Sequence, residues 1–306
     1  MTKQIVDALV VGGGPAGLSA AIYLARARRT AVVLDGDGGR SAGPQVNENY
    51  LGFPRGVKAS RLRQLGRRQA ERFGARFVGG TVDAATCVRE DEFVLVGDCG
   101  EWHGRAVIVA TGVTDVWPAI PNVERYIGRS LFWCIVCDGF RALGRRTLLI
   151  GATDEAATTA CQFLTYTKKL TFVATGVGDE VTIAPDKIAM MEEHGIEVVE
   201  GTIDRVDGAR GQIRRVHACG EVYDVDLVFS LLGQVPNSRL AASLGAILDD
   251  RGYVRIDGEQ RTNVRLVYAA GDVTGPYAHQ VTSAVHEGAT AAQTANWDLY
   301  PAFQKE

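Results

Sequence analysis

IVDALVVGGGPAG, residues 5–17, is an apolar run that leads directly into the pattern Gly-x-Gly-x-x-Gly. An unbroken run of apolar residues is typical of a strand that is buried in a parallel sheet. Small and apolar residues at helical spacing follow, and TAVVLD, residues 30–35, then predicts a second strand. The order strand, glycine turn, helix and strand predicts an α/β fold that begins with a βαβ unit.

The glycines of this turn suit the binding of a dinucleotide. Gly12 permits the tight turn, Gly14 lets the backbone approach a pyrophosphate, and Gly17 lets the helix pack close to the strand. Asp35 ends the second strand 18 residues beyond Gly17, where an acidic side chain holds a ribose hydroxyl. A glycine-rich loop without a ligand is the alternative, but strand, helix and acidic residue together favour nucleotide binding.

A second unit of the same kind occurs in the middle of the chain. Residues 146–176, RTLLIGATDEAATTACQFLTYTKKLTFVATG, again read strand, turn, helix and strand. Two prolines in TDVWPAIPN, residues 114–122, indicate a linker before it. We therefore predict two Rossmann-like dinucleotide-binding domains, with the central one inserted into the other. The predicted boundaries are 1–114 and 244–306 for the outer domain and 115–243 for the inserted one.

Composition excludes several classes of protein. The length of 306 residues suggests about two domains, and a hydrophobic content of 46% is enough for a sizeable core. A formal net charge of −3 gives no bulk electrostatic attraction to nucleic acid or to anionic membranes. No run of about 18 apolar residues predicts a membrane span. Because the chain opens on a strand rather than a signal peptide, we expect a cytoplasmic protein.

Cys134 and Cys137 lie in FWCIVCDGF, residues 132–140, at a spacing that permits a small redox-active disulfide ring. Asp138 follows directly and is placed to pass a proton to the departing thiolate. Half of a zinc site and a pair of plain buried thiols are the alternatives. Zinc is disfavoured because the sequence has no second Cys-x-x-Cys and no closely spaced histidine pair, so no metal site is expected. Redox chemistry is the favoured interpretation.

Taken together, these motifs resemble the low-molecular-weight thioredoxin reductases along nearly the whole chain. GGGPAG with Asp35, NENYLGFP (residues 47–54), VIVATG (107–112), CIVCDG and YAAGDV (268–273) occur in that family's order. The resemblance implies a homodimeric flavoprotein with FAD in the outer domain and the cysteine pair on the inserted domain. It also implies that Cys137 faces the flavin, that Cys134 exchanges with substrate, and that Asp138 is the acid–base residue.

The resemblance further implies a set of FAD contacts, two of which depart from the family. His279 stands where the family commonly has arginine beside the flavin ring, and Arg40 stands where glutamine is usual. His279 is also a candidate catalytic residue, because histidine can carry protons near neutral pH. The implied FAD-binding residues are Gly12, Gly14, Pro15, Ala16, Gly17, Asp35, Arg40, Asn49, Ala110, Thr111, Gly112, Gly271, Asp272, His279, Gln280 and Val281.

The second glycine turn departs from the NADPH-binding pattern of the family, which is Gly-x-Gly-x-x-Ala. Thr153 in Gly151-Ala152-Thr153-Asp154-Glu155-Ala156 places a branched side chain where a pyrophosphate needs close approach to the backbone. Asp154 and Glu155 add like charge beside it. Residues 171–186 contain three acidic residues and no Lys or Arg, whereas NADPH-dependent members carry arginines there for the 2′-phosphate. We therefore predict a degenerate NADPH site.

The predicted function is that of an FAD-dependent dithiol/disulfide oxidoreductase that does not use NADPH as its donor. Relatives without nicotinamide dependence take electrons from ferredoxin or oxidise small dithiols with dioxygen. A thioredoxin-like protein and a small dithiol or disulfide both remain open as partners.

Three alternatives to this function stay open: a small-molecule dithiol oxidase, an ordinary NAD(P)H-dependent thioredoxin reductase, and a flavin-binding redox sensor. A second flavin in the central site, stacked on residues 163–166, is a further alternative. Ordinary core packing is the favoured interpretation of those aromatic residues.

Overall fold

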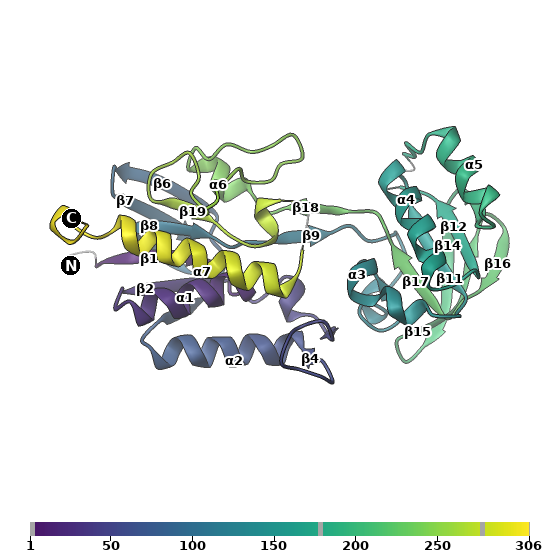
Figure 1. The fold of residues 1–306 in the computed structure, drawn as a ribbon, viewed down its shortest axis with the longest axis horizontal. Helices are drawn as coiled ribbons and strands as arrows, with labels where there is room; N and C mark the ends of the chain where they lie inside the picture. Colours follow the sequence, from purple (N-terminus) through teal and green to yellow (C-terminus); the bar gives the residue numbers. More distant parts are fainter. Residues whose placement is uncertain (1–3, 177–179, 276–278, 306) are drawn as a thin grey trace. The chain divides into compact units, whose positions relative to one another are not determined.

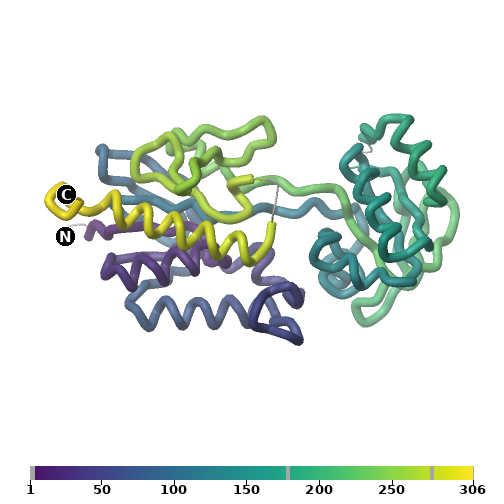
Figure 2. The backbone as a smooth tube through the Cα atoms, viewed as in Figure 1, coloured from purple at the N-terminus to yellow at the C-terminus, as the bar shows by residue number. Residues whose placement is uncertain are grey.

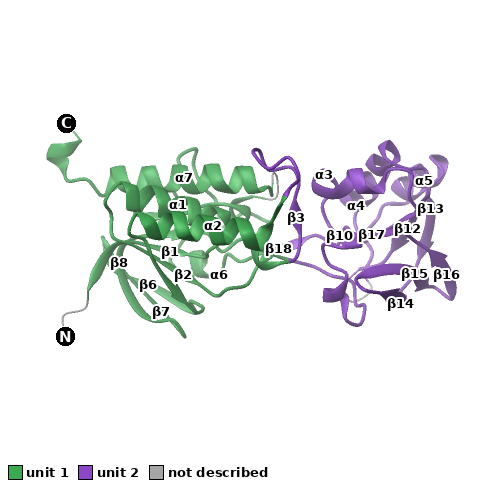
Figure 3. Cartoon of the chain, turned by 90° about the horizontal axis from the view of Figure 1, so that it is seen from below, with its two compact units in different colours: residues 1–43, 57–114, 235–306 green, residues 44–56, 115–234 purple. Residues whose placement is uncertain are grey.

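The computed structural model of the chain describes residues 4–176, 180–275 and 279–305. Within these ranges the chain divides into two compact units (Figure 3). Unit 1 comprises residues 1–43, 57–114 and 235–306, and unit 2 comprises residues 44–56 and 115–234. Among the described residues, no helix combines the length and the apolar character that a membrane crossing requires.

Unit 1 is built on a sheet whose strands run in the order β5-β2-β1-β8-β7-β6, with β19 paired to β8. In the parallel part, Ala8 lies opposite Ala31 on one side and Ala106 on the other. The central strands are almost wholly buried, as expected for parallel strands that are covered on both faces. The strands are β1 (Ile5–Val11), β2 (Ala31–Asp35), β5 (Arg76–Gly79), β6 (Ala84–Arg89), β7 (Glu92–Gly97), β8 (Gly100–Val109) and β19 (Val267–Ala269).

The helices of unit 1 are α1 (Pro15–Arg26), α2 (Ala59–Arg72), α6 (Arg239–Ser243) and α7 (Val281–Asp298). Helices α1 and α7 come from opposite ends of the sequence and lie side by side (Figures 1 and 2). They approach so closely that a Cβ on Gly288 would lie 2.0 Å from the carbonyl oxygen of Ala16. Small residues on α7 therefore determine how tightly it packs against the helix of the first βαβ unit.

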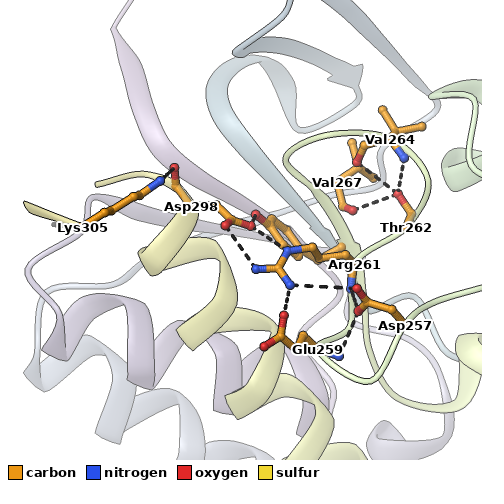
Figure 4. Close-up of polar contacts among 9 residues, drawn as sticks. Asp257, Glu259, Arg261, Thr262, Val264, Val267, Asp298 and Lys305 are labelled. Carbon is orange, nitrogen blue, oxygen red and sulfur yellow. Dashed lines mark hydrogen bonds and ion pairs between the residues drawn. The ribbon is translucent and has the colours of Figure 1, made fainter. Parts of the chain in front are cut away.

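A polar cluster joins the end of α7 to β19 and to the loop before that strand (Figure 4). The Asp298 carboxylate accepts hydrogen bonds from the Tyr268 hydroxyl at 2.7 Å and from Arg261 Nε and Nη2 at 3.0 and 3.2 Å. Burial, together with the hydrogen bond to Asp298, raises the pKa of Tyr268. Glu259 also pairs with Arg261, from a more exposed position.

Unit 2 contains a parallel sheet in the order β10-β17-β11-β12-β13 and a small antiparallel sheet, β14-β15-β16. Apolar side chains such as Phe172 and Phe229 fill one side of the parallel sheet, and Leu148 and Val228 belong to the cluster on the other. Its elements are β10 (Leu131–Phe132), α3 (Ile135–Asp138), β11 (Thr147–Gly151), α4 (Asp154–Gln162), β12 (Leu170–Ala174), α5 (Pro185–Glu193), β13 (Glu197–Glu200), β14 (Ile203–Ala209), β15 (Gln212–Ala218), β16 (Glu221–Asp224) and β17 (Leu227–Ser230).

Both units contain the predicted βαβ order, so the predicted α/β class with two Rossmann-like domains is confirmed. Phe163 is fully buried against Phe229, with ring centroids 4.6 Å apart, in agreement with its interpretation as core packing. Short strands β9 (Val113–Asp115) and β18 (Gln234–Pro236) pair where the chain passes between the units, and β3 (Val46–Asn47) pairs with β4 (Val57–Lys58).

The ranges of the units differ from the predicted domain boundaries in two places. Residues 235–243, predicted in the inserted domain, lie in unit 1 because Leu240 and Ala241 of α6 are buried in the core of that unit. Residues 44–56, predicted in the outer domain, group with unit 2, where Glu48 forms an ion pair with Arg141.

Candidate active site

Cys134 and Cys137 form a disulfide at the start of α3. Cys134 is the N-cap of this short helix, and its Sγ accepts a hydrogen bond from the Cys137 backbone N–H at 3.1 Å. The helical turn brings residues three apart onto one face, so the two Cα atoms lie 5.3 Å apart, within the usual range for a disulfide. The helical turn therefore presents both sulfurs as one dithiol/disulfide centre.

Asp138 completes the same helical turn and is mostly buried, with 13% of its side chain exposed. Arg141 Nε donates a hydrogen bond to Asp138 Oδ1 at 2.7 Å. Burial raises the pKa of the Asp138 carboxyl above its usual range, although the Arg141 guanidinium acts in the opposite direction. A buried carboxyl with a raised pKa is suited to exchanging protons near a thiol.

Arg141 also reaches a second carboxylate. Its Nη2 donates to Glu48 Oε1 at 2.8 Å, and its guanidinium carbon lies 5.4 Å from the ring centroid of Phe132 and 5.0 Å from that of Phe140. Sequence reasoning did not identify Arg141 or Glu48. The spacing of three residues between Asp138 and Arg141 was a usable signal, whereas nothing in the sequence linked Glu48 to them.

Apolar side chains lie exposed beside the disulfide. Val136, between the two cysteines, is 73% exposed, and Phe140 is 49% exposed. Leu143 is also exposed, and Trp133 packs edge-on against Trp117 with ring centroids 5.4 Å apart. Val136 and Phe140, which flank the cysteine pair in sequence, thus expose apolar surface.

The glycine turn of unit 1 has the geometry that a dinucleotide needs. A Cβ on Gly12, whose φ is +108°, would lie 2.3 Å from the Ala110 carbonyl oxygen, and one on Gly17 would lie 1.9 Å from the Gly12 oxygen. Gly14 faces open space, since a Cβ there would meet Ser41 Oγ at an ordinary 3.7 Å. Gly14 is also the N-cap of α1, so the first N–H groups of that helix point toward an anion held there. The pyrophosphate of a dinucleotide fits this cradle.

Asp35 ends β2 beside this turn, as predicted, but it does not stand alone. Arg63 from α2 pairs with Asp35, forms an ion pair with Asp37 at 2.7 Å, and donates from Nε to the Gly13 carbonyl oxygen at 3.2 Å. Sequence reasoning missed Arg63, because nothing singles it out from the other arginines of the same helix.

The remaining predicted cofactor residues of unit 1 gather at the carboxyl ends of parallel strands. Ala110, Thr111 and Gly112 follow β8, and Gly271 and Asp272 follow β19, which pairs with β8. The carboxyl ends of such strands are where nucleotide sites form in open α/β sheets. Pro15 and Ala16 open α1, and Val281 opens α7.

Three of these residues have polar partners that fix their side chains. Arg40 Nη1 lies 2.8 Å from Asp272 Oδ2. His279 Nε2 lies 2.6 Å from the Gly275 carbonyl oxygen, so this nitrogen carries a hydrogen. Gln280 caps α7 in a reciprocal arrangement with Ser283. Asn49 belongs to segment 44–56 of unit 2, so the structure does not group it with the unit 1 residues.

The central turn has a different arrangement. Thr153 is the N-cap of α4, and its hydroxyl accepts a hydrogen bond from the Ala156 N–H at 3.3 Å. Asp154 Oδ1 accepts from the Ala184 N–H at 2.8 Å, and the Thr182 N–H donates to the Ala152 carbonyl oxygen at 2.7 Å. The turn is thus occupied by its own polar contacts. Asp179, one of the three acidic residues after β12, lies outside the described residues.

Known proteins with similar sequences are disulfide oxidoreductases. Residues 6–288 match the family described as pyridine nucleotide-disulphide oxidoreductase. The thioredoxin reductase of Listeria monocytogenes is 29% identical, with 96% of this chain and 93% of the relative covered. That of Mycolicibacterium smegmatis is 33% identical, with 95% and 96% covered.

Solved structures agree with the sequence matches. Thioredoxin reductase from Streptococcus pyogenes superposes with a TM-score of 0.88 at 25% identity, covering 97% of this chain and 99% of that one. The atypical thioredoxin reductase TRi from Desulfovibrio vulgaris is 33% identical with a TM-score of 0.53, covering 95% and 96%. The chain therefore belongs to the pyridine nucleotide-disulphide oxidoreductases and, within them, to the low-molecular-weight thioredoxin reductases, and is a flavoprotein disulfide oxidoreductase.

Proposed function

We propose that this enzyme passes electrons between FAD, the Cys134–Cys137 pair and a substrate disulfide or dithiol, and that NADPH is not its electron donor. The observation that carries the second part is the turn at residues 151–156. Thr153 stands where the family has glycine, and its hydroxyl caps α4. A branched side chain that is held in this place obstructs the approach of a pyrophosphate to the backbone.

Electrostatics support the same proposal. The first turn of α4 carries Asp154 and Glu155, which oppose the binding of an anion at the helix N-terminus. The sequence from residue 171 to 186 offers no Lys or Arg to pair a 2′-phosphate. The loss of cations and the presence of carboxylates act together, so the pyrophosphate and the 2′-phosphate of NADPH would both lack favourable partners here.

The chemistry proposed for the cysteine pair follows from its geometry. Bound FAD supplies the electron pair that is exchanged with the disulfide. In the reductive direction the S–S bond breaks, and Asp138 protonates the outgoing sulfur. The Asp138 carboxylate then takes the proton of the Cys134 thiol as this sulfur attacks a substrate disulfide, which releases one substrate thiolate and forms a mixed disulfide. Cys137 attacks Cys134, re-forms the internal disulfide and releases the second substrate thiol. Run in reverse, the same steps oxidise a substrate dithiol.

The residues proposed to hold FAD are those predicted from the sequence, with Arg63 added. Gly12, Gly14 and Gly17 form the cradle for the pyrophosphate, and Asp35 with Arg63 lies where the ribose belongs. His279 is the proposed proton-carrying residue of the flavin site, acting through Nδ1 because Nε2 is bonded to a carbonyl oxygen.

A thioredoxin-like protein is the proposed partner. The support is the exposure of Val136 and Phe140 beside the disulfide, since an exposed apolar surface suits docking of a protein. Oxidation of a small dithiol by dioxygen is the alternative, and oxygen consumption with dithiothreitol would favour it.

Ferredoxin is the proposed class of electron donor. The proposed assembly is a homodimer, and the proposed location is the cytoplasm. Sedimentation equilibrium tests the assembly.

The test of the donor is an anaerobic titration of the yellow protein with NADPH and then NADH, followed at the flavin absorption band. We expect neither to bleach the band promptly, while dithionite reduces the flavin and so establishes that the flavin itself can accept electrons. A reduced ferredoxin should then replace dithionite. Prompt stoichiometric bleaching by NADPH would show that residues 151–156 bind it despite Thr153, and the proposal on the donor would be wrong.

A further inference from the structure

We infer that Arg141 is a positioning residue of the thiol–disulfide reaction, which holds the Asp138 carboxylate beside the cysteine pair and joins it to Glu48. The inference deepens the proposed function and rests on it, because Asp138 has a task only if the cysteine pair is the reacting centre. Arg141 acts through Asp138, to which its Nε donates a hydrogen bond.

The geometry fixes Arg141 from several sides. Its Nε bonds to Asp138 at 2.7 Å and its Nη2 to Glu48 at 2.8 Å, so the two carboxylates take different nitrogens of one planar group. The rings of Phe132 and Phe140 lie within about 6 Å of the guanidinium carbon, a range in which cation–π attraction operates. Only 28% of the Arg141 side chain is exposed.

The local fold explains why Arg141 reaches Asp138. The turn at residues 139–142 continues directly from α3, so residue 141 follows residue 138 at the helical spacing of three. Gly139 permits this continuation, because a Cβ there would lie 3.0 Å from both Ile135 Cγ1 and the Tyr166 ring. Arg141 therefore lies on the helical turn that directly follows the one with the cysteine pair.

Three influences act on the Asp138 carboxyl. Burial raises its pKa most strongly, Arg141 from the following turn lowers it through a hydrogen bond and charge, and Glu48 from segment 44–56 raises it. The cysteine pair lies on the same helix as Asp138. Removal of Arg141 would leave burial and the like charge of Glu48 unopposed, so Asp138 would keep its proton to higher pH. A protonated Asp138 cannot accept the proton of an attacking thiol.

The experiment is the pH dependence of thiol–disulfide exchange by the pre-reduced enzyme with 5,5′-dithiobis(2-nitrobenzoate), which needs no electron donor. Arg141→Gln should move the lower-pH limb of the rate profile upward by about one to three pH units. Rates on that limb would fall about tenfold for each unit. Glu48→Gln should move the limb in the opposite direction, and Arg141→Lys should recover part of the wild-type profile.

Arg146→Gln is the matched control, because it removes an arginine–aspartate pair of the same unit that does not involve Asp138. Its profile should equal that of the wild type. A limb that stays in place in Arg141→Gln, with circular dichroism and flavin content unchanged, would overturn the inference. A shift of Glu48→Gln in the same direction as Arg141→Gln would also overturn it.

Asp138→Asn separates this inference from the proposed function. If Asp138→Asn exchanges at the wild-type rate at every pH, the acid–base step of the proposed function fails. If Asp138→Asn is slow but Arg141→Gln keeps the wild-type limb, only the inference on Arg141 fails.

Discussion

Cys134 and Cys137 have different tasks in the proposed reaction, and single substitutions can separate them. With Cys137→Ser, Cys134 can still attack a substrate disulfide, but no second thiol is present to release the product. We expect Cys137→Ser to accumulate a stable mixed disulfide with a thioredoxin-like protein, visible by mass spectrometry. Both single variants should lose turnover by about a thousandfold or more.

Cys134→Ser is the matched control for trapping. It should form no adduct under the same conditions, because the thiol that remains is the one assigned to the flavin. An adduct in Cys134→Ser and none in Cys137→Ser would contradict the assignment and would exchange the two tasks. Equal trapping by both variants would mean that the cysteines are not distinguished by position.

At the scale of single residues, the sequence predicted what is local and missed what depends on tertiary contacts. The Cys-x-x-Cys-Asp run needs only one helical turn to bring its groups together, so its spacing was sufficient. Arg63 of helix α2 reaches Asp35, at the end of strand β2, across 28 residues of sequence, and no local pattern distinguishes it from its neighbours. Glu48 and Arg141 are further apart still and meet through the fold of segment 44–56.

Helices and strands could be predicted where glycine turns and apolar runs repeat along the sequence. The residues at which one domain ends and the other begins were harder to predict. The two βαβ units could be found because a buried strand followed by a tight turn leaves few sequence choices. Helix α6 has only five residues, and its assignment depends on Leu240 finding the core of unit 1. Such a short helix has little pattern of its own, so tertiary packing decides where it belongs.

The polar cluster at the end of α7 gives a prediction at the scale of elements. Asp298→Asn removes the charge that binds Arg261 and the Tyr268 hydroxyl, and Tyr268 is buried. We expect the free energy of unfolding to fall by about 1–3 kcal/mol at pH 7, because hydrogen bonds to a charged acceptor become bonds to a neutral one. Urea unfolding of both proteins measures the difference.

The difference in unfolding free energy between the wild type and Asp298→Asn should become smaller as the pH falls. Burial opposes ionisation of Asp298, but the hydrogen bonds from Arg261 and Tyr268 outweigh it and lower the pKa of Asp298. Because the folded-state pKa lies below the unfolded one, the stabilisation is complete above the unfolded pKa and is lost as pH falls through both. The gap between wild type and Asp298→Asn should therefore narrow below about pH 4.

Glu259→Gln is the control for Asp298→Asn. Glu259 pairs with the same arginine from a position that is 65% exposed, so its loss should cost less than about 1 kcal/mol. Equal costs for the two variants would mean that the cluster acts as an ordinary surface ion pair. A gap that widens as pH falls would contradict the assigned sign.

On the scale of the whole molecule, the two units have separate hydrophobic cores. One cluster of buried residues lies entirely in unit 1, and the other two lie entirely in unit 2. The glycine cradle for the dinucleotide lies in unit 1, whereas the disulfide lies in unit 2. Each unit therefore carries its own packing energy, and the glycine turn proposed to hold the cofactor's pyrophosphate belongs to only one.

We therefore predict that, once the flavin is removed, unit 1 and unit 2 unfold in two separate transitions. A ligand that binds only the folded state adds about 4 kcal/mol when present at a thousand times its Kd, and this term would be lost from unit 1. Trp102 and Trp297 report on unit 1, and Trp117 and Trp133 on unit 2. The double variant Trp102→Phe/Trp297→Phe keeps only the tryptophans of unit 2, and Trp117→Phe/Trp133→Phe keeps only those of unit 1. Near-ultraviolet circular dichroism of each variant, with and without flavin, therefore assigns each transition to one unit. The unit 1 midpoint should fall on removal of flavin while the unit 2 midpoint stays. Midpoints that fall together would mean that the two cores unfold as one cooperative structure.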